Sequence, residues 1–461
     1  MIPNILAQRY ASTELVELFD PINRIRLERK FWIEVLELQK KYGFNLDDKI
    51  INSYKKNVEK IDLKSIENRE IKTRHDVKAK IEEFNFLAGY EFIHIGMTSR
   101  DLTDNIELIQ IKDAMQIILA KIVSVLVLLN EKINMYKQVY VVGRTHNVPA
   151  QVTTLGKKFA NFASELLDAY EDAQLISENM RLRGIRGAIG TNQDSLQFFA
   201  KTDLVNINEE LAVHYGFKAV HKSVGQIYPR SEDYLIISKL LLICASLNSF
   251  AINIRLMSGQ GYLSEGMALD QTGSTAMPHK INPRTSERIN GLMSLLRGYA
   301  SIASELSGNQ WNEGDVSCSV VRRVIIQDAF FATDGILNSI HNILTNLVIH
   351  EDKMKEDLQN NLPFLCSSTI LMYLVKSGLG REESHKKIKD LVNRYSQDSE
   401  EFKKQLIIEF KKHVSVEQLE KIFQDFASLS GNSVNECESL YKTILKTIKK
   451  EKSNLKFEMR F

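Results

Sequence analysis

Apolar residues recur every three or four positions over several long stretches of the chain, a spacing that is typical of amphipathic helices. Alternation of apolar and polar residues between turn dipeptides, which indicates strands, is scarce. Only seven prolines interrupt the sequence, and residues 22–148 and 284–362 contain none, so long helices are permitted there. The pattern therefore predicts an all-α fold. The helical spacing is clearest at residues 109–133, 234–257, 289–306 and 321–347.

Residues 235–256, with the sequence LIISKLLLICASLNSFAINIRL, are apolar on almost every face of the expected helix. Such a helix must be buried on most of its faces. A bundle shared between subunits would bury it, so we expect a homo-oligomer. The sequence before about residue 104 and after about residue 353 is more mixed and more charged. We therefore predict an N-terminal helical domain (1–104), a central long-helix bundle (105–353) and a C-terminal helical domain (354–461).

The 461 residues exceed one ordinary hydrophobic core, which agrees with more than one unit. Hydrophobic residues make up 44% and charged residues 26%, a balance typical of a soluble globular protein. Lysine and arginine number 60 against 58 acidic residues, so no nucleic-acid-binding surface is expected. The first residues, MIPNILAQRY, lack the regions of a signal peptide, and the most apolar run, 117–129, is too short for a bilayer span. We expect a cytoplasmic protein with no membrane partner.

Residues that commonly hold metals or cofactors are scattered along the chain. The ten histidines show no HxH or HxxxH spacing beside carboxylates, and neither a P-loop nor a GxGxxG motif occurs. The cysteines lie far apart without a CxxC pair, so reduced thiols are expected. We therefore expect neither a metal ion nor a bound cofactor. The four cysteines are Cys244, Cys318, Cys366 and Cys437.

The segment GSTAMPHKINP, at residues 273–283, concentrates polar chemistry. Two prolines and a glycine predict a loop between helices, yet this loop carries a serine, a histidine, a lysine and an asparagine. Glycines at positions 259, 261 and 266 precede it. Such a segment is either a plain connector or a lid that closes over a ligand, and its polar content favours the lid.

A second segment, GRTHNVPAQVTTLGK at residues 143–157, directly follows an apolar helix. Pro149 permits a turn, and we expect His146 at a helix–loop junction. A lone histidine at a helix end is more often structural than catalytic. The neighbouring Arg144 and Thr145 favour a functional role.

The segment HIGMTSRDLTDN, at residues 94–105, places Thr98 and Ser99 just before a predicted helix whose first turn includes Asp101. A hydroxyl in this position usually caps the helix. The N–H groups of a helix N-terminus also bind a carboxylate well, and the motif leaves both interpretations open. Three weaker polar segments are QRY (8–10), TRHDV (73–77) and GQIYPRSED (225–233).

Together these segments resemble a known family. GSTAMPHKINP resembles the specific Gly-Ser-Ser-x-Met-Pro-x-Lys-x-Asn-Pro motif of the fumarase/aspartase superfamily, and HIGMTS and GRTHNVPAQ resemble two further blocks of it in the same order. QRYAS, TRHDV, the PHK of the loop and SERINGL after it resemble the adenylosuccinate lyase family within that superfamily. The resemblance covers nearly the whole chain. It implies an all-α homotetramer whose active sites combine blocks from three subunits.

The resemblance also implies a β-elimination that releases fumarate from a purine nucleotide: adenylosuccinate would give AMP, and SAICAR would give AICAR. A weakly acidic proton must leave Cβ beside a carboxylate, and the charge that develops there needs fixed hydrogen-bond donors. The departing purine nitrogen needs a proton.

Carried over by position, the resemblance implies Ser274 as the base, His146 as the general acid and Glu287 as its partner. Lys280 and Asn282 would hold the succinyl carboxylates. Further substrate contacts are implied for Thr98, Ser99 and Thr145 at the carboxylates, for His75, Arg74 and Asp76 in orienting the substrate, for Gln226 and Arg230 in lining the pocket, and for Arg9, Tyr10, Ser319 and Arg323 at the 5′-phosphate.

Two positions depart from the family pattern. This chain carries Gly314 where many members carry a substrate-binding arginine, so one guanidinium is missing there. Arg322 is a candidate to replace it. Asn147 and Val148 follow the predicted acid where Gly-Gln or Phe-Gln is common, which would reshape the pocket near the leaving group.

The sequence also allows other functions to be considered. Argininosuccinate lyase, aspartase, fumarase and carboxymuconate cycloisomerase belong to the same superfamily, but none of them needs a phosphate pocket. A catalytically inactive helical scaffold, as among lyase-derived lens proteins, is the alternative of a different class. The presence of Ser274, His146 and Lys280 weighs against an inactive scaffold.

Overall fold

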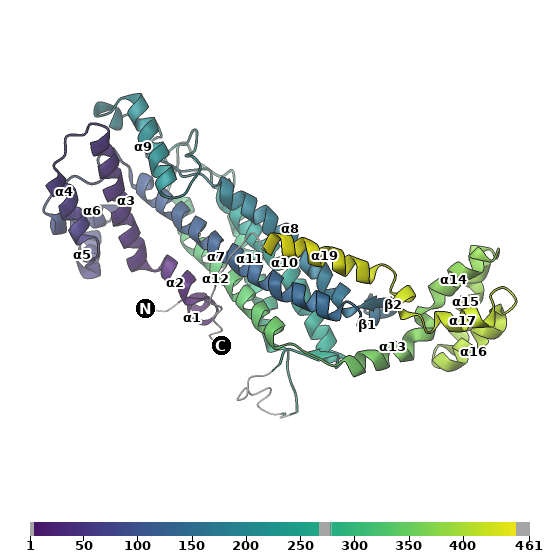
Figure 1. Cartoon of the computed structure of the whole chain (residues 1–461). Helices are drawn as coiled ribbons and strands as arrows, with labels where there is room; N and C mark the ends of the chain where they lie inside the picture. The colour runs from purple at the N-terminus through teal and green to yellow at the C-terminus, as the bar shows by residue number, and fades with distance from the viewer. Residues whose placement is uncertain (1–3, 267–276, 278, 449–461) are drawn as a thin grey trace.

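The molecule is elongated, with helices along almost its whole length (Figure 1). This computed structural model describes residues 4–266, 277 and 279–448. Within those residues the strands form two separate two-stranded sheets, and helices make up the rest of the regular structure, so the predicted all-α fold is confirmed. The first helices lie at one end, long helices fill the middle, and shorter helices lie at the other end.

Six helices form the N-terminal end: α1 (Ile5–Arg9), α2 (Thr13–Phe19), α3 (Pro21–Lys41), α4 (Asp48–Asn57), α5 (Leu63–Thr73) and α6 (Asp76–Ala88). α3 begins at a proline, whose fixed φ suits the first helical position. The Asp20 carboxylate caps α3 by accepting the N–H groups of Ile22 and Asn23. Arg29 of α3 and Glu83 of α6 form a buried ion pair that ties the two helices together.

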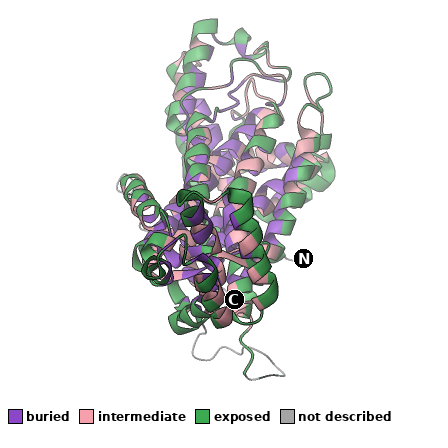
Figure 2. Ribbon diagram, turned by 90° about the vertical axis from the view of Figure 1, so that its right-hand side faces the viewer, coloured by how far each residue is buried: buried purple, intermediate pink, exposed green. Residues whose placement is uncertain are grey.

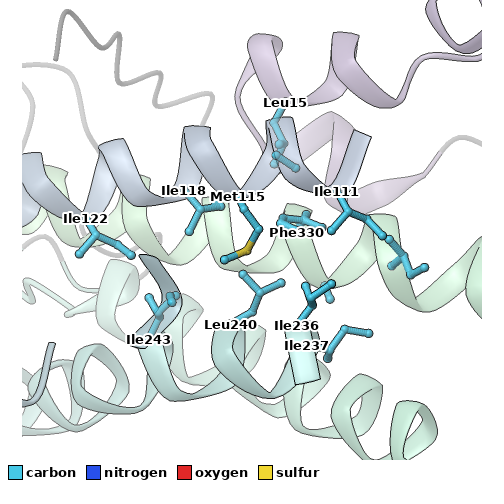
Figure 3. Packing of buried hydrophobic residues seen from close by; sticks show 14 of the residues in the cluster. Leu15, Ile111, Met115, Ile118, Ile122, Ile236, Ile237, Leu240, Ile243 and Phe330 are labelled. Carbon is cyan, nitrogen blue, oxygen red and sulfur yellow. The ribbon is translucent and has the colours of Figure 1, made fainter. Parts of the chain in front are cut away.

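Five long helices form the central bundle: α7 (Ser99–Tyr136), α8 (Leu155–Asn179), α10 (Ser231–Gly259), α11 (Arg284–Leu306) and α12 (Ser317–Asn346). α12 packs against α7, α10 and α11, and α8 packs against α7 and α10. Figure 3 shows Met115 and Ile118 of α7 beside Leu240 of α10 and Phe330 of α12 in the shared core. Each such buried apolar side chain contributes about 1.5–3 kcal/mol, so the bundle is the main source of stability.

α10 is the one helix in the described part of the chain that is long and apolar enough to cross a membrane, and 56% of its most apolar window is buried. It packs against α8, α11 and α12, as a core helix of a bundle does. Leu242, Ile252 and Leu256 on α10 remain exposed in the single chain.

A buried ion pair crosses the middle of the bundle. The Lys121 ammonium of α7 binds the Asp334 carboxylate of α12, and it also donates to Ser12 Oγ (3.0 Å) and Asn338 Oδ1 (3.1 Å). The Ser12 N–H donates to the second carboxylate oxygen of Asp334 (2.6 Å). Buried charges are tolerated only when they are paired and hydrogen-bonded, and here the partners fix α2, α7 and α12 relative to one another.

A β-hairpin follows α7, where β1 (Tyr140–Thr145) pairs antiparallel with β2 (Val148–Thr154). The expected helix–loop junction at His146 is therefore wrong: His146 and Asn147 form the two-residue loop of the hairpin, with φ of 52° and 62°. Such a loop needs positive φ at both positions and favours asparagine. The alternation in YVVGRT and VPAQVTT is too short to separate a strand pair from an irregular segment. The remaining short elements are β3 (Leu263–Ser264), β4 (Val348–Ile349), η1 (Ser195–Gln197) and α9 (Lys201–His214).

Six short helices follow β4: α13 (Glu351–Leu365), α14 (Ser367–Lys376), α15 (Arg381–Tyr395), α16 (Ser399–Phe410), α17 (Val416–Ile422) and α18 (Phe426–Leu429). Several of them share a separate core that includes Phe402, Leu406 and Phe410. α19 (Ser433–Ile448) then returns to pack along α7 and α8 (Figure 1). Figure 2 shows the buried residues gathered inside the helical layers, with exposed residues on their outer faces.

Candidate active site

A buried network holds the N-terminus of α7. The Thr98 N–H donates to Asp101 Oδ2 (2.8 Å), and the N–H groups of Arg186 and Gly187 donate to the same carboxylate (2.8 and 2.9 Å). Asp101 is fully buried, so its fixed carboxylate locks the start of the helix. Thr98 and Ser99 are half-buried there, at a helix N-terminus whose N–H groups favour an anion.

Three helix N-termini meet at this end of the molecule. Arg100 of α7 donates to Ser319 Oγ of α12 at 2.6 Å. Arg323, one turn further along α12, lies 3.4 Å from the Asp76 carboxylate at the start of α6. His75 caps α6, and its Nδ1 accepts a backbone N–H of that helix (3.3 Å). We call the following residues the head cluster: His75, Asp76, Thr98, Ser99, Arg100, Ser319 and Arg323.

Three other predicted residues lie around the head cluster. Arg230 is buried and donates to both oxygens of Asp104 (3.1 and 3.0 Å), the carboxylate that Arg100 also binds (3.2 Å). Gln226 is held through its backbone N–H, which donates to a carbonyl oxygen ahead of α12 (2.8 Å). Arg74 is exposed and ends α5 with a φ of 52°. Arg230 therefore supports the head cluster from behind through a shared carboxylate.

A second cationic group surrounds Tyr10. The guanidinium of Arg288 lies 5.9 Å from the centroid of the Tyr10 ring. Burial lowers the pKa of Arg288; Tyr10 opposes this shift, and the charges of Arg284 and Arg9 add to it. We call Arg9, Tyr10, Arg284 and Arg288 the tyrosine cluster. Arg288 is a further candidate that was not predicted from the sequence, although it stands directly after Glu287 and could have been found from that neighbour.

The residues predicted to bind the 5′-phosphate fall into both clusters. Tyr10 lies against Gly335 of α12, where an added Cβ would be 2.8 Å from Tyr10 Cβ. Ser319 stands more than four turns earlier in the same helix, which places it about 24 Å away at 1.5 Å per residue. Within one chain, Arg9 and Tyr10 therefore cannot bind the phosphate that Ser319 and Arg323 bind.

His146 lies exposed at the tip of the hairpin, beside the exposed Thr145. Arg144 braces the hairpin: its Nη2 donates to both oxygens of Asp357 in α13 (3.0 and 2.8 Å) and to the hydroxyl of Tyr262 (3.3 Å). The tight turn thus presents the imidazole at the surface on a support that is tied to α13.

The loop that carries the implied base is only partly described, because Ser274 lies outside the described residues. Later in the same motif, Lys280 is exposed and Asn282 is half-buried. Glu265 caps α11 by accepting two of its first N–H groups (3.0 and 2.7 Å). Glu287 is exposed in the first turn of α11. It follows Lys280 by seven residues in the sequence.

The hairpin and the head cluster lie at opposite ends of α7. The helix has 38 residues, so its ends are about 55 Å apart, and Figure 1 shows the hairpin and α6 at far ends of the bundle. A single chain therefore cannot bring its own His146 to its own Thr98 and Ser99. The predicted site residues that the structure describes therefore lie in three places: the head cluster, the hairpin tip, and the tyrosine cluster with the adjoining loop before α11.

The two departures from the family pattern have different structural settings. Gly314 has a φ of 148°, and an added Cβ would lie 3.1 Å from Cγ1 of Ile227, so both backbone and space favour glycine. Arg322 is buried, donates to Asp233 (2.7 Å) and binds Glu107. The hypothesis that Arg322 replaces the missing guanidinium is therefore wrong, because its charge is already used inside the protein. Asn147 occupies the hairpin turn.

The described residues also bear on metal and thiol chemistry. Across residues 4–266, 277 and 279–448, no group of three or more histidine, cysteine, aspartate or glutamate side chains is arranged to hold a metal ion. The four cysteines are buried and not disulfide-bonded. An anion at the head cluster would meet the side chains of Arg100, Ser319 and Arg323 and the helix N-termini beside them.

Comparison with known proteins adds to this geometry. A family model described as Lyase matches residues 40–298. Relatives named adenylosuccinate lyase include those of Schistosoma mansoni (33% identity, 84% of this chain and 82% of that protein) and Saccharomyces cerevisiae (33%, 84% and 82%). Similar structures include 3-carboxy-cis,cis-muconate lactonizing enzyme from Pseudomonas putida (TM-score 0.82, 17% identity, 96% of this chain and 99% of that chain) and fumarate lyase from Mesorhizobium sp. BNC1 (0.81, 18%, 94% and 98%). The structural likeness concerns the fold alone.

Proposed function

Because this chain belongs to the adenylosuccinate lyase family of carbon–nitrogen lyases, we propose that it eliminates fumarate from adenylosuccinate to give AMP, and from SAICAR to give AICAR, in purine nucleotide biosynthesis. The observation that carries this proposal is the similarity to relatives of that name along most of the chain. The two groups of arginines and hydroxyls agree with a substrate that bears a phosphate and two carboxylates.

In this mechanism, His146 donates a proton to the departing purine nitrogen, with Glu287 as its partner. Ser274 removes the proton from Cβ. A serine hydroxyl is too weak a base on its own, so Lys280 and backbone N–H groups stabilise the alkoxide once the loop closes over the substrate. A positioned general acid or base contributes about 10²–10⁴-fold. Unchanged turnover in Lys280→Met would contradict the role of Lys280.

The anionic groups of the substrate divide among the clusters. Thr98 and Ser99 hold the succinyl carboxylates because a helix N-terminus stabilises negative charge at no cost in reorganisation. Lys280, Asn282 and Thr145 assist them. His75, Arg74 and Asp76 orient the substrate, and Gln226 and Arg230 support the pocket. The 5′-phosphate is bound by Ser319 and Arg323 of one chain together with Arg9, Tyr10 and Arg288 of a second chain.

The working enzyme is a homotetramer in which each active site combines residues of several chains. The length of α7 supports this, since a second chain can place its His146 beside the head cluster of the first, which one chain cannot do alone. Closed symmetric assembly is the usual way for a soluble chain to bury such surfaces. Exposed apolar side chains on the bundle fit an interface between bundles: Leu242, Ile252 and Leu256 of α10, Leu295 and Ile302 of α11, and Val320 and Val324 of α12.

We also propose that the chain is organised as an N-terminal domain (1–104), a bundle (105–353) and a C-terminal domain (354–461). The separate core around Phe402 supports an independent C-terminal unit, and α19 ties that unit back to α7 and α8. The nearly balanced charge, with a net value of +2, agrees with a cytoplasmic enzyme of small-molecule metabolism that has no nucleic-acid or membrane partner.

An ultraviolet absorbance assay of the purified protein with adenylosuccinate tests the proposed reaction. We expect conversion to AMP and fumarate, and its loss in Ser274→Ala and His146→Gln while both variants keep the wild-type oligomer. Failure of the wild type to convert adenylosuccinate or SAICAR would overturn the assignment. Argininosuccinate would then be the next substrate to test, because it also releases fumarate but has no phosphate.

A further inference from the structure

Arg100 has no assigned role, although it stands directly after Thr98 and Ser99 at the head of α7. Its Nη2 donates to Ser319 Oγ at 2.6 Å, and its Nη1 donates to Asp104 Oδ1 at 3.2 Å. The first contact links the N-termini of α7 and α12. Arg100 therefore touches a residue that our proposed function places at the substrate phosphate.

The charge of Arg100 is only partly balanced inside the protein. Its carboxylate partner, Asp104, already accepts two hydrogen bonds from the buried Arg230 and lies 3.7 Å from Arg322. The other carboxylates near this group, Glu107 and Asp233, are bound by Arg322, and Glu107 also binds Arg24. Arg24 has a further partner in Glu28, but that carboxylate pairs with Lys80 (2.7 Å). The guanidiniums in the group thus outnumber the carboxylates: Arg24, Arg100, Arg230 and Arg322 face Asp104, Glu107 and Asp233.

Hydrogen-bond donors are in excess as well. Arg230 is 4% exposed, and its Nε and Nη1 have no hydrogen-bond partner among the described residues. Buried donors normally find partners. The surplus of donors and of positive charge beneath Arg100 points to an anion that is supplied from outside the chain.

The side chains around Arg100 suit a phosphate. Ser319 and Arg323 stand four residues apart, on one face of α12, and Arg100 reaches that face from α7. The N-terminus of α12 adds a favourable dipole for an anion. Gly314, three residues before α12, carries no guanidinium, and Arg322 is committed to Asp233 and Glu107. Arg100 therefore supplies the guanidinium that neither Gly314 nor Arg322 offers to a phosphate at this place.

We propose that Arg100 is a substrate-binding residue that holds the 5′-phosphate together with Ser319 and Arg323. On binding, the guanidinium donates to phosphate oxygens in place of the Ser319 hydroxyl and keeps its contact with Asp104. The fork of N–H donors in arginine matches two oxygens of one phosphate. The inference rests on the proposed function, because it takes the substrate to be a purine nucleotide.

The test compares two substrates that differ only in the phosphate: adenylosuccinate and its nucleoside, succinyladenosine. Arg100→Gln should raise KM for adenylosuccinate by about tenfold to a hundredfold, the range for a lost charged hydrogen bond, with kcat little changed. The same variant should leave kcat/KM for succinyladenosine within a factor of about two of the wild type. Arg100→Lys should have a KM for adenylosuccinate between those of the wild type and Arg100→Gln. Loss of kcat/KM by the same factor for both substrates would overturn the proposal and make Arg100 a residue that only positions α7.

Arg24→Gln is the matched control, because Arg24 belongs to the same ionic group but pairs with Glu28 and Glu107 and not with Ser319 among the described residues. Its effect should be equal for the two substrates. Gel filtration and thermal melting of each variant separate misfolding from weak binding.

Calorimetry gives a readout that needs no turnover. AMP should bind Arg100→Gln at least tenfold more weakly than the wild type, while adenosine should bind both equally. If the wild type cleaves neither purine substrate, the proposed reaction fails but this binding test still decides whether Arg100 holds a phosphate. Equal AMP affinity in wild type and Arg100→Gln would overturn the inference.

Discussion

The two ends of α7 hold their polar residues in opposite ways. At the head, Thr98, Ser99 and Arg100 rest on buried carboxylates, with Asp101 and Asp104 beneath them. At the tail, the hairpin carries an exposed histidine and is braced by one partly exposed ion pair. The head thus holds its polar groups in a fixed network, whereas the tail presents an exposed imidazole at a tight turn.

In the function that we propose, this difference gives the two ends complementary roles. Binding of an anion needs donors that do not reorganise, and the buried network at the head supplies them. Proton transfer needs a group that can approach the substrate closely, and a tight turn at the surface allows this. Because about 55 Å separate the two ends, our proposed function requires His146 of one chain to act at the head cluster of another.

The largest expected effect falls on the tail. His146→Gln should lower kcat for adenylosuccinate by about 10²–10⁴-fold, with little change in KM, because the variant keeps the shape of the turn and loses the proton. Initial rates of AMP formation measure it. His214→Gln, which replaces another exposed histidine, is the control and should keep wild-type rates; a reduction below tenfold in His146→Gln would contradict the role as general acid.

The middle of α7, between the two ends, is held to α12 by the buried ion pair of Lys121 and Asp334. Lys121→Met should destabilise the protein by about 3–5 kcal/mol, because it leaves the buried Asp334 carboxylate without its cation. Urea unfolding measures the loss. The double variant Lys121→Met/Asp334→Asn should recover much of it, whereas a double variant as unstable as the single one would show that packing, and not the unpaired charge, is responsible.

The stability of the folded protein should decrease in acid because of His94, which lies near the head. Burial lowers the pKa of His94 to about 4, helped by the charges of His75 and Lys78, and its Nδ1 accepts a hydrogen bond from Trp32 Nε1 (3.1 Å). The folded state therefore binds fewer protons than the unfolded state between about pH 4 and 6.5.

Stability linked to His94 is thus fully present above about pH 6.5 and is lost as the pH falls toward 4. The free energy of unfolding should drop by about 2 kcal/mol between pH 7.5 and pH 5 on this account. Urea unfolding at the two pH values measures it, with His94→Asn as the comparison, since asparagine tolerates the φ of 68° at this position. An equal pH dependence in wild type and His94→Asn would contradict the assignment.

The smallest expected effect concerns the brace of the hairpin. Arg144→Met removes the ion pair with Asp357, so His146 is held less accurately, and kcat should fall by about tenfold. Stability should change by less than about 1 kcal/mol, because both side chains are partly exposed. Asp357→Asn should have the same effect on kcat, and the double variant should add nothing. Additive losses would show that the two residues act separately.

Much of this organisation could be predicted from the sequence. The helical spacing and the scarcity of prolines predicted the all-α fold, and the polar segments pointed to residues at both ends of α7. The hairpin was missed because its strands are short and its turn depends on positive φ, which His146 does not signal. Arg100 was missed because an arginine beside cap residues has no local signal of its own, and its contact with Ser319 depends on the fold. Arg288 could have been found from its neighbour Glu287, but its position over Tyr10 is set by the fold alone. The role of Arg322 was misjudged for the same reason, since only the fold reveals its buried carboxylates.

The most direct test mixes two variants that we expect to be inactive, because one lacks the proposed general acid and the other lacks the histidine that orients the substrate. His146→Gln and His75→Ala, one altered at the tail and one at the head, are each purified, unfolded together and refolded as mixed oligomers. If the two ends come from different chains, random mixing in a symmetric tetramer should restore about a quarter of the wild-type activity, while each variant refolded alone stays inactive. No recovery in oligomers that mass spectrometry shows to be mixed would mean that each chain carries a whole site, contrary to the separation of the ends of α7.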